Sequence, residues 1–221
     1  MKILAIDTSH QLSLAVCQDQ KVLLRRSAKV QKNLSQVLSK RIFAIVEKAE
    51  WKLDDFDLIA FGLGPGTFTG LRVGLSLVKG LVFQKKTRVI GVPSIEAIAY
   101  GVKEHGTICV IQDARRDMVF SAVYLKTDDN LQQIREPRLS KIEDALEGLP
   151  KGTIFTGNGV ILFSKQIQKA CSQAKFLSEK FWYPLAKNIA ALAYSKAVNK
   201  QYDDVETLIP LYLYSDDCQV R

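Results

Sequence analysis

Residues that bind metals or form disulfides are scarce in this chain. It has only two histidines, His10 and His105, and its four cysteines are far apart and form no CxxC pair. No HExxH or HxxxH pair occurs, so the ligand patterns of zinc and iron proteases are missing. We therefore expect no metal and no other cofactor. We expect reduced, mostly buried thiols at Cys17, Cys109, Cys171 and Cys218.

Long apolar runs are also missing. No stretch reaches the roughly 20 apolar residues of a membrane helix. The opening residues, MKILAIDTSHQLSLAV, are interrupted by Asp7, His10 and Gln11, unlike the continuous core of a signal peptide. With 221 residues, 47% of them hydrophobic, the chain is long enough for one large or two small cores. We expect a cytoplasmic protein that does not associate with membranes.

Acidic residues are absent from residues 20–46, in a chain whose formal net charge is +8. Residues 151–187 form a second basic region. Such a balance suits a polyanion such as RNA or an acidic protein partner, and a solvated basic surface is an equal alternative. We take Arg25, Arg26 and Lys29 as the candidates for RNA contact. The basic residues of the first region are Lys21, Arg25, Arg26, Lys29, Lys32, Lys40 and Arg41.

One order of elements, strand, strand, strand, helix, strand, helix, is predicted twice. Apolar or alternating runs predict the strands, and apolar residues at helical spacing predict the helices. The plan is that of the α/β actin-like fold (ASKHA, ribonuclease H-like), so we expect two such halves, residues 1–103 and 104–221. The first half has strands at 2–7, 12–17, 21–29, 57–62 and 88–92 and helices at 33–51, from about 67, and after Ser94. The second has strands at 107–113, 118–125, 131–139 and 152–157 and helices at 140–149, 158–170 and 185–200.

Each half has a strand that ends in an aspartate, Asp7 or Asp113, where proteins of this fold hold ATP phosphates or their metal. A hairpin that wraps phosphate needs glycine, so that backbone N–H groups can approach the oxygens. Neither the loop Asp7-Thr8-Ser9-His10 nor the loop from Asp113 to Asp117 contains glycine. We expect at most a vestigial nucleotide site at Asp7, Thr8, Ser9 and Asp113. The alternative is an acid bonded to its own turn amides, and a charged hairpin tip at Arg115 and Arg116.

The stretch GLGPGTFTGLRVG, residues 62–74, matches neither the Walker nor the Rossmann phosphate-binding pattern. The helix that follows is apolar around most of its circumference, so nearly every side must be covered. Gly66, Gly70 and Gly74 form one stripe along which a second backbone can approach, and each mid-helix glycine costs about 1 kcal/mol against alanine. Two explanations remain open: close packing on the chain's own sheet, or a second chain along this helix and the helix at 34–46.

Several motifs resemble those of the TsaB (YeaZ) family, in that family's order and over essentially the whole chain. The run GPGTFTGLRVG at residues 64–74 is the most specific of them. The others are ILAIDTS at 3–9, KG at 79–80, GVPSIEA at 91–97, DARRDMVF at 113–120, EPRL at 136–139 and PLYL at 210–213.

The resemblance implies a non-catalytic, actin-like paralogue of TsaD that lacks the metal-binding histidines of that subunit. With TsaD and the ATPase TsaE, such a protein is needed to install threonylcarbamoyl on adenosine 37 of tRNAs that read codons beginning with A. The donor is threonylcarbamoyl-adenylate. TsaD, TsaE and, through the complex, tRNA would be its partners, with pairing through helices of the first half and a homodimer when it is alone. A stand-alone ATP-using or hydrolytic (glycoprotease-like) enzyme of the same fold is the alternative.

The expected partner-binding residues come from two segments, the helix at 34–46 and the glycine-rich helix. Two positions depart from the family's pattern. Leu34-Ser35-Gln36 stands where the family has His-Ser-Glu, and Tyr214 stands where it has arginine. The first departure lies on the expected pairing helix and therefore bears on the geometry of the partner or homodimer. The expected partner-binding residues are Leu34, Val37, Leu38, Arg41, Gly66, Thr69, Gly70, Val73, Gly74, Leu77 and Leu81.

Overall fold

The structure, a computed structural model, describes residues 1–29, 33–128 and 130–214. Lys32 and Cys218, named above, lie outside these ranges. The described chain forms two five-stranded sheets and divides into two compact units. Unit 1 consists of Met1–Ala97 and Pro184–Leu211, and unit 2 of Ile98–Tyr183 and the chain from Tyr212.

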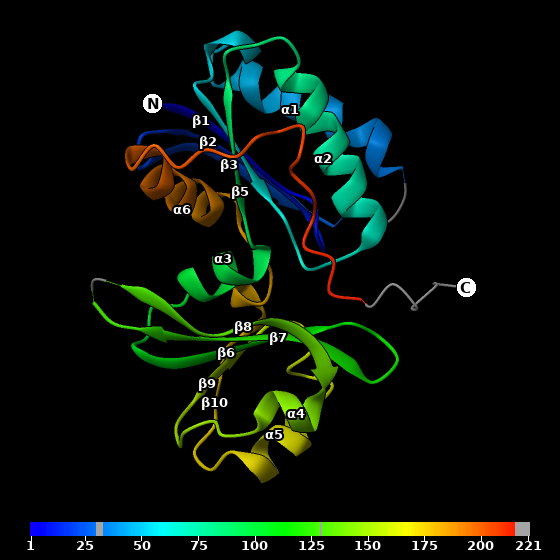
Figure 1. The fold of residues 1–221 in the computed structure, drawn as a ribbon, viewed down its shortest axis with the longest axis vertical. Coiled ribbons are helices and arrows are strands. Elements are labelled where there is room, and N and C mark those ends of the chain that lie inside the picture. The colour runs from blue at the N-terminus through cyan, green and yellow to red at the C-terminus, as the bar shows by residue number, and fades with distance from the viewer. Residues whose placement is uncertain (30–32, 129, 215–221) are drawn as a thin grey trace. The chain divides into compact units, whose positions relative to one another are not determined.

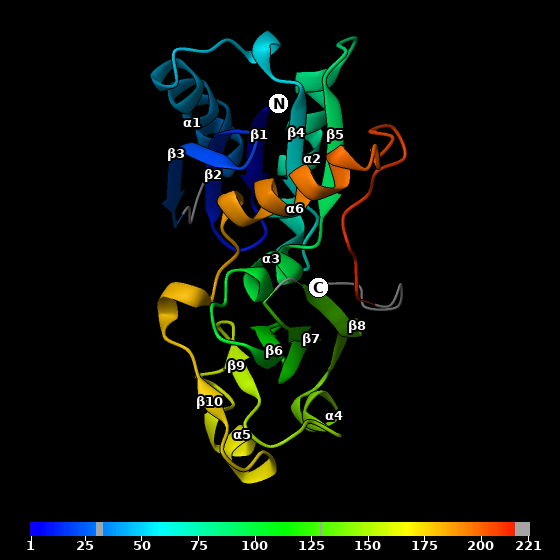
Figure 2. The same cartoon turned by 90° about the vertical axis from the view of Figure 1, so that its left-hand side faces the viewer.

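Unit 1 is built from three layers, with its sheet in the middle. The sheet has the order β3-β2-β1-β4-β5, with β1 antiparallel to β2 and parallel to β4. Helices α1 and α2 lie together on one face, and α6 lies on the other (Figures 1 and 2). The bounds are β1 Lys2–Asp7, β2 Leu12–Gln18, β3 Lys21–Ala28, α1 Leu34–Lys48, β4 Leu58–Gly62, α2 Phe68–Val82, β5 Arg88–Val92 and α6 Ala186–Val198, with a short 3-10 turn η1 at Leu53–Asp55. Helix α3, Ser94–Tyr100, begins in unit 1 and ends in unit 2.

Strict alternation along the strands explains these layers. Leu4 and Ile6 of β1 face the core under α1 and α2, whereas Ile3 and Ala5 face α6. The side toward α6 is rich in alanine, both on the strands and on the helix, so the helix can pack closely on the sheet. Its small residues are Ala5, Ala15, Ala60, Ala186, Ala190, Ala193 and Ala197.

Unit 2 repeats the plan. Its sheet has the order β10-β9-β6-β7-β8, which is the order of unit 1 read from the other edge. The predicted α/β fold with a duplicated order of elements is therefore confirmed. All five strands of the first sheet were predicted, and the second sheet has a fifth strand, β10, that was not. The bounds are β6 Gly106–Asp113, β7 Met118–Lys126, β8 Leu131–Lys141, α4 Ile142–Leu146, β9 Ile154–Thr156, α5 Ser164–Ala170, β10 Lys175–Phe176 and the 3-10 turn η2 Glu179–Phe181.

The compact units differ from the expected halves 1–103 and 104–221 in two respects: unit 1 ends first at Ala97, and the chain returns to it from Pro184 to Leu211. The last helix, expected in the second half, packs on the sheet of unit 1. Asn188 donates a hydrogen bond to the Ala97 carbonyl (2.9 Å), and the Ala186 amide donates to Ser13 Oγ (2.9 Å). Unit 1 is therefore discontinuous in sequence, because the face of its sheet opposite α1 and α2 is covered from the far end of the chain.

Candidate functional site

The first strand-end acid, Asp7, is enclosed by its own chain. Its side chain is fully buried. Oδ1 accepts hydrogen bonds from the Ser9 amide (3.0 Å) and Ser9 Oγ (2.7 Å), and Oδ2 accepts one from Ser94 Oγ (2.5 Å). Ser94 Oγ in turn accepts the Gly64 amide (2.9 Å). Both carboxylate oxygens of Asp7 are thus engaged by the turn and by the start of α3.

Burial also changes the acidity of this carboxyl group. Loss of hydration raises the pKa of Asp7 from 3.8 to about 6, and the hydrogen bonds from Ser94 and Ser9 partly oppose the rise. Thr8 and Ser9 are buried as well, and Thr8 Oγ1 donates to the Gly70 carbonyl (2.8 Å). The turn at Asp7, Thr8 and Ser9 is in the place expected for a nucleotide loop, but its polar groups bind the chain itself.

The glycine-rich loop and the first turns of α2 lie directly on this turn. The Thr67 amide donates to the Ser9 carbonyl (2.7 Å). A Cβ on Gly70 would overlap the Thr8 carbonyl oxygen. One on Gly74 would overlap Thr8 Oγ1 and lie 2.7 Å from Phe61 Cε2. The opening left by the missing side chains is therefore filled from within the same chain.

This finding corrects part of the sequence analysis. The glycine stripe does not receive a second chain, because a Cβ at Gly66 would likewise meet Ser9. Gly70, Gly74 and, on α1, Leu38 are buried and so are no direct partner contacts. Of the two explanations left open for the stripe, close packing within the chain is the one observed.

The solvent side of α1 and α2 is nevertheless a distinct surface, which we call the α1–α2 face. On α2, the exposed residues recur every three or four positions and so share one side of the helix. Half-buried aliphatic side chains border them. Exposed phenylalanines, Phe43, Phe68 and Phe83, stand on the two helices and at the end of α2, each more than half exposed. The α1–α2 face comprises Leu34, Val37 and Arg41 of α1 and Thr69, Arg72, Val73, Ser76, Leu77, Gly80 and Leu81 of α2.

A segment that the sequence analysis missed covers another part of α2. After α6 the chain runs back past α2 (Figure 1), and Val205 and Leu208 pack against the core of unit 1. Lys79 of α2 donates to the Glu206 carbonyl (2.8 Å), and the Leu211 amide donates to the Leu63 carbonyl (2.8 Å). The KG motif at residues 79–80 could have indicated this contact, because a lysine on an apolar helix needs a polar acceptor.

The second strand-end acid, Asp113, lies in unit 2 and is partly exposed. Asp113 Oδ1 accepts a hydrogen bond from the Arg115 amide (2.8 Å). The acid is therefore bonded to its own turn, which is the alternative that the sequence analysis gave for a strand-end acid. Arg115, Arg116 and Asp117 all have positive φ values (63°, 51° and 58°), which places them in the left-handed region. Tyr214 Oη donates to the Ala114 carbonyl (2.9 Å), so the residue that replaces the family's arginine holds the chain end to this hairpin.

The basic candidates Arg25 and Arg26 lie on β3, an edge strand of unit 1. Both side chains are exposed, and both line a hollow of about 330 Å³ with Lys48 of α1 and no acidic residue. Lys29 is exposed beyond the end of β3 and does not line this hollow. Because Arg25 and Arg26 are consecutive on the strand, their side chains point to opposite faces of the sheet.

Over the described ranges, no group of three His, Cys, Asp or Glu side chains is placed to hold a metal ion. Cys17, Cys109 and Cys171 are buried free thiols, and burial raises the pKa of Cys109 to about 12. In the same part of the chain, no helix is long and apolar enough to cross a membrane.

Two sheets of the same strand order, each with a strand-end aspartate, define an α/β protein of the actin-like class. The fold of an inorganic polyphosphate/ATP-glucomannokinase from Arthrobacter agrees with this, with a TM-score of 0.50 at 9% identity over 89% of this chain and 99% of that chain. YeaZ from Pseudomonas aeruginosa has the same fold with a TM-score of 0.84, at 22% identity over 96% of this chain and 99% of that chain.

Comparison of the sequence with protein families identifies the family to which the chain belongs. Residues 27–220 match the family described as "TsaD: tRNA N6-adenosine threonylcarbamoyltransferase", and the chain belongs to that family. Within it, the chain is similar to proteins named "tRNA threonylcarbamoyladenosine biosynthesis protein TsaB". That of Bacillus subtilis is 27% identical over 100% of this chain and 97% of its own length. That of Buchnera aphidicola subsp. Schizaphis graminum is 28% identical over 88% of this chain and 93% of its own length.

Proposed function

We propose that this chain is a TsaB subunit, a non-catalytic partner of TsaD in the formation of N6-threonylcarbamoyladenosine at position 37 of tRNAs that read codons beginning with A. TsaE is the third component, and the reaction takes place in the cytoplasm. The observation that carries the proposal is the α1–α2 face of a chain whose relatives are named for this biosynthesis.

The composition of the α1–α2 face supports pairing with another folded protein. Val37, Val73 and Leu77 keep part of their apolar surface in solvent, and the exposed Phe68 and Phe83 lie at the two ends of α2. Interfaces are enriched in aromatic residues and arginine and need a closely packed apolar centre. Thr69 and Ser76 are small, exposed residues next to the aliphatic ones, and they allow a partner helix to approach.

A substitution at Ser76 tests the pairing without disturbing the core. Ser76 is exposed in the middle of α2, and Ser195 is exposed in the middle of α6 on the opposite face of the same sheet. We expect Ser76→Arg to weaken association with TsaD at least tenfold, about 1.4 kcal/mol, and Ser195→Arg to leave it unchanged. Calorimetric titration of TsaD measures both. Equal affinity of the Ser76→Arg variant and the unmodified chain would overturn the assignment of this face.

The same face serves a homodimer when TsaD is absent. Light scattering at increasing protein concentration should show a dimer of the unmodified chain and a monomer of the Ser76→Arg variant. A Ser76→Arg variant that dimerises normally would show that the homodimer uses another surface. Leu34, in place of the family's histidine, packs against the core and is only half-buried, so it borders this interface.

The strand-end acids support a subunit that does not perform the chemistry. Asp7 is sealed beneath its own turn, and Asp113 is bonded to its hairpin. In a reconstituted complex, Asp113→Asn should leave the rate of threonylcarbamoyl transfer within about twofold, because a lost catalytic group costs far more, on the order of a hundredfold. Turnover of ATP or peptide by the isolated chain, abolished by this substitution, would instead establish the stand-alone enzyme.

We further propose that Arg25, Arg26 and Lys29 contact tRNA in the assembled complex. Support comes from the exposure of all three side chains on or beside the edge strand β3, with no acidic residue lining the hollow there. Phosphate contacts release counterions, so tRNA affinity should fall steeply with salt. Reversal of the three charges to glutamate should reduce the slope of log K against log salt concentration by about three, one for each phosphate contact that is lost. An unchanged slope would remove tRNA contact at this edge while leaving the pairing proposal intact.

A further inference from the structure

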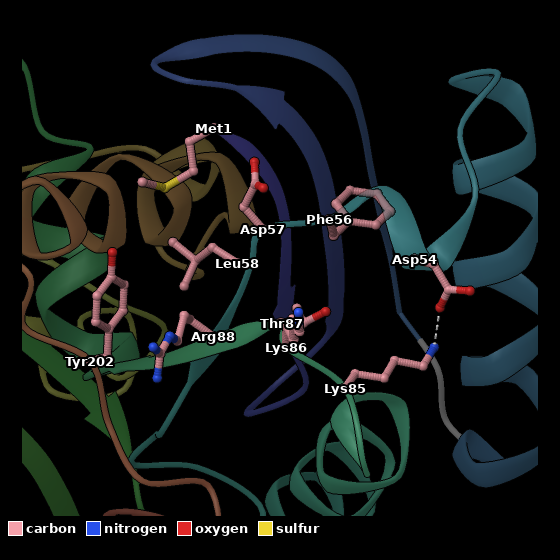
Figure 3. A pocket seen from close by; sticks show the side chains of 10 residues that line it. All are labelled: Met1, Asp54, Phe56, Asp57, Leu58, Lys85, Lys86, Thr87, Arg88 and Tyr202. Carbon is pink, nitrogen blue, oxygen red and sulfur yellow. Dashed lines mark ion pairs between the residues drawn. The ribbon is translucent and has the colours of Figure 1, made fainter.

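A larger hollow of unit 1 opens at the end of the sheet where β1, β4 and β5 begin (Figure 3). Its volume is about 600 Å³, which lies within the usual range for small-molecule sites. Leu58 and Arg88 in its wall are the first residues of β4 and β5, whereas Asp7 is the last residue of the parallel strand β1. The hollow is therefore remote from the strand-end loops and independent of them.

One wall of this hollow can stack a planar ring. The Arg88 guanidinium lies 5.4 Å from the centre of the Tyr202 ring, and Figure 3 shows the two side chains next to each other. Phe56 and Leu58 also line the hollow and are buried. Aromatic rings and guanidinium planes are the groups on which proteins stack nucleobases.

The lining carries three basic side chains, Lys85, Lys86 and Arg88, and two acidic ones, Asp54 and Asp57, so these side chains have a net positive charge. Lys85 is paired with Asp54 (2.7 Å), as Figure 3 shows. The other lining acid, Asp57, accepts the backbone amide of Lys2 at Oδ2 (2.7 Å). Lys86 and Arg88 form no ion pair within the described part of the chain.

Thr87 stands between these two cations in the sequence and is partly exposed. Lys86 and Arg88 both line the hollow and offer several donors to a phosphate group. Charge-assisted hydrogen bonds of this kind are the strong ones. A phosphate here would be held beside the ring-stacking wall.

We propose that this hollow binds a nucleotide, with the base against Tyr202 and the phosphate between Lys86 and Arg88. The ligand is either a free nucleotide or the phosphorylated end of an RNA strand, which share this chemistry. The inference does not depend on pairing with TsaD, since every residue it uses belongs to unit 1 of the isolated chain.

The test is calorimetric titration of the isolated chain at low salt with AMP, adenosine, inorganic phosphate and a 5′-phosphorylated oligoadenylate. We expect AMP to bind with a Kd of about 1 mM or below. Lys86→Ala should weaken AMP about tenfold, the value of one charge-assisted hydrogen bond, and leave adenosine unchanged. Tyr202→Ala should weaken both ligands. Lys103→Ala, at an exposed lysine of unit 2, is the matched control and should change neither.

Tyr202→Phe distinguishes the loss of ring stacking from the loss of a hydrogen bond within the chain. The Tyr202 hydroxyl donates to the Ala197 carbonyl (3.3 Å), and the phenylalanine variant loses that bond but keeps the ring, so it should still bind AMP. Tighter binding of the oligoadenylate than of AMP identifies an RNA end as the ligand, and weaker binding identifies a free nucleotide. Absence of AMP binding at about 10 mM, equal affinities for phosphate and AMP, or insensitivity to both Lys86→Ala and Tyr202→Ala would overturn the proposal.

Discussion

Gly74 and Gly80 occur in the same helix, but their surroundings predict opposite effects of alanine. At Gly74 an added Cβ would overlap Thr8 Oγ1 and lie 2.7 Å and 2.9 Å from two atoms of the Phe61 ring. At Gly80 the same Cβ would meet nothing within 4 Å. Both sites gain the same helix propensity from alanine, so the difference between the two variants isolates the contact with the turn after β1.

The magnitudes follow from two terms. Replacing a helical glycine by alanine gains about 1 kcal/mol, and forcing one extra carbon into a closely packed site costs about 1–3 kcal/mol. We therefore expect Gly80→Ala to raise the free energy of unfolding by about 0.5–1 kcal/mol and Gly74→Ala to lower it by up to about 2 kcal/mol. For the same reason a larger residue at Gly74 should damage the fold of unit 1 before it affects any partner.

The assay is urea unfolding followed by tryptophan fluorescence. The chain has two tryptophans, Trp51 in unit 1 and Trp182 in unit 2, so a Trp182→Phe background reports on unit 1 alone. Both alanine variants are compared with this background. If the two variants shift the midpoint in the same direction by equal amounts, the packing of α2 on Thr8 and Phe61 is not what requires glycine at 74.

Two further predictions concern pH and the helix α4. The pKa of Asp7 rises from 3.8 to about 6 on folding, so between these pH values folded unit 1 keeps a proton that the unfolded chain releases. Its stability should therefore fall as pH rises through this window, by up to about 3 kcal/mol in total, and should level off above it. Arg135 of β8 donates to the carbonyls of Ala145 (2.9 Å) and Glu147 (2.7 Å) at the end of α4, so Arg135→Ala should destabilise unit 2 by about 1–3 kcal/mol.

Each of these has a matched control. Asp7→Asn removes the titrating group, and its unfolding midpoint should not vary with pH over the window; a slope that persists would assign the effect to another residue. Glu136→Ala lies on the same strand as Arg135 but is exposed, and it should leave the thermal midpoint of unit 2 unchanged. Equal losses in the two variants would show that the bonds of Arg135 to α4 contribute nothing.

The sequence by itself determined the fold class and most element positions. The continuous apolar run of β1, the alternating residues of β2 and the helical spacing in α1 are local signals, and they predicted these elements to within a few residues of their observed ends. The repetition of one element order predicted two units of the same topology. β10 was missed, because Lys175 and Phe176 are too few to carry a pattern and become a strand only by pairing with β9.

Only the tertiary structure decided what the glycine stripe and the last helix do. Spacing shows that Gly70 and Gly74 lie on one side of α2, but the same spacing suits the chain's own turn or a second protein, and the fold brought Thr8 there. The alanines of α6 likewise suit any smooth surface, and the sheet of unit 1 is the one they cover. A sequence pattern specifies the kind of surface that must be buried; which segment buries it depends on contacts between residues far apart in the chain.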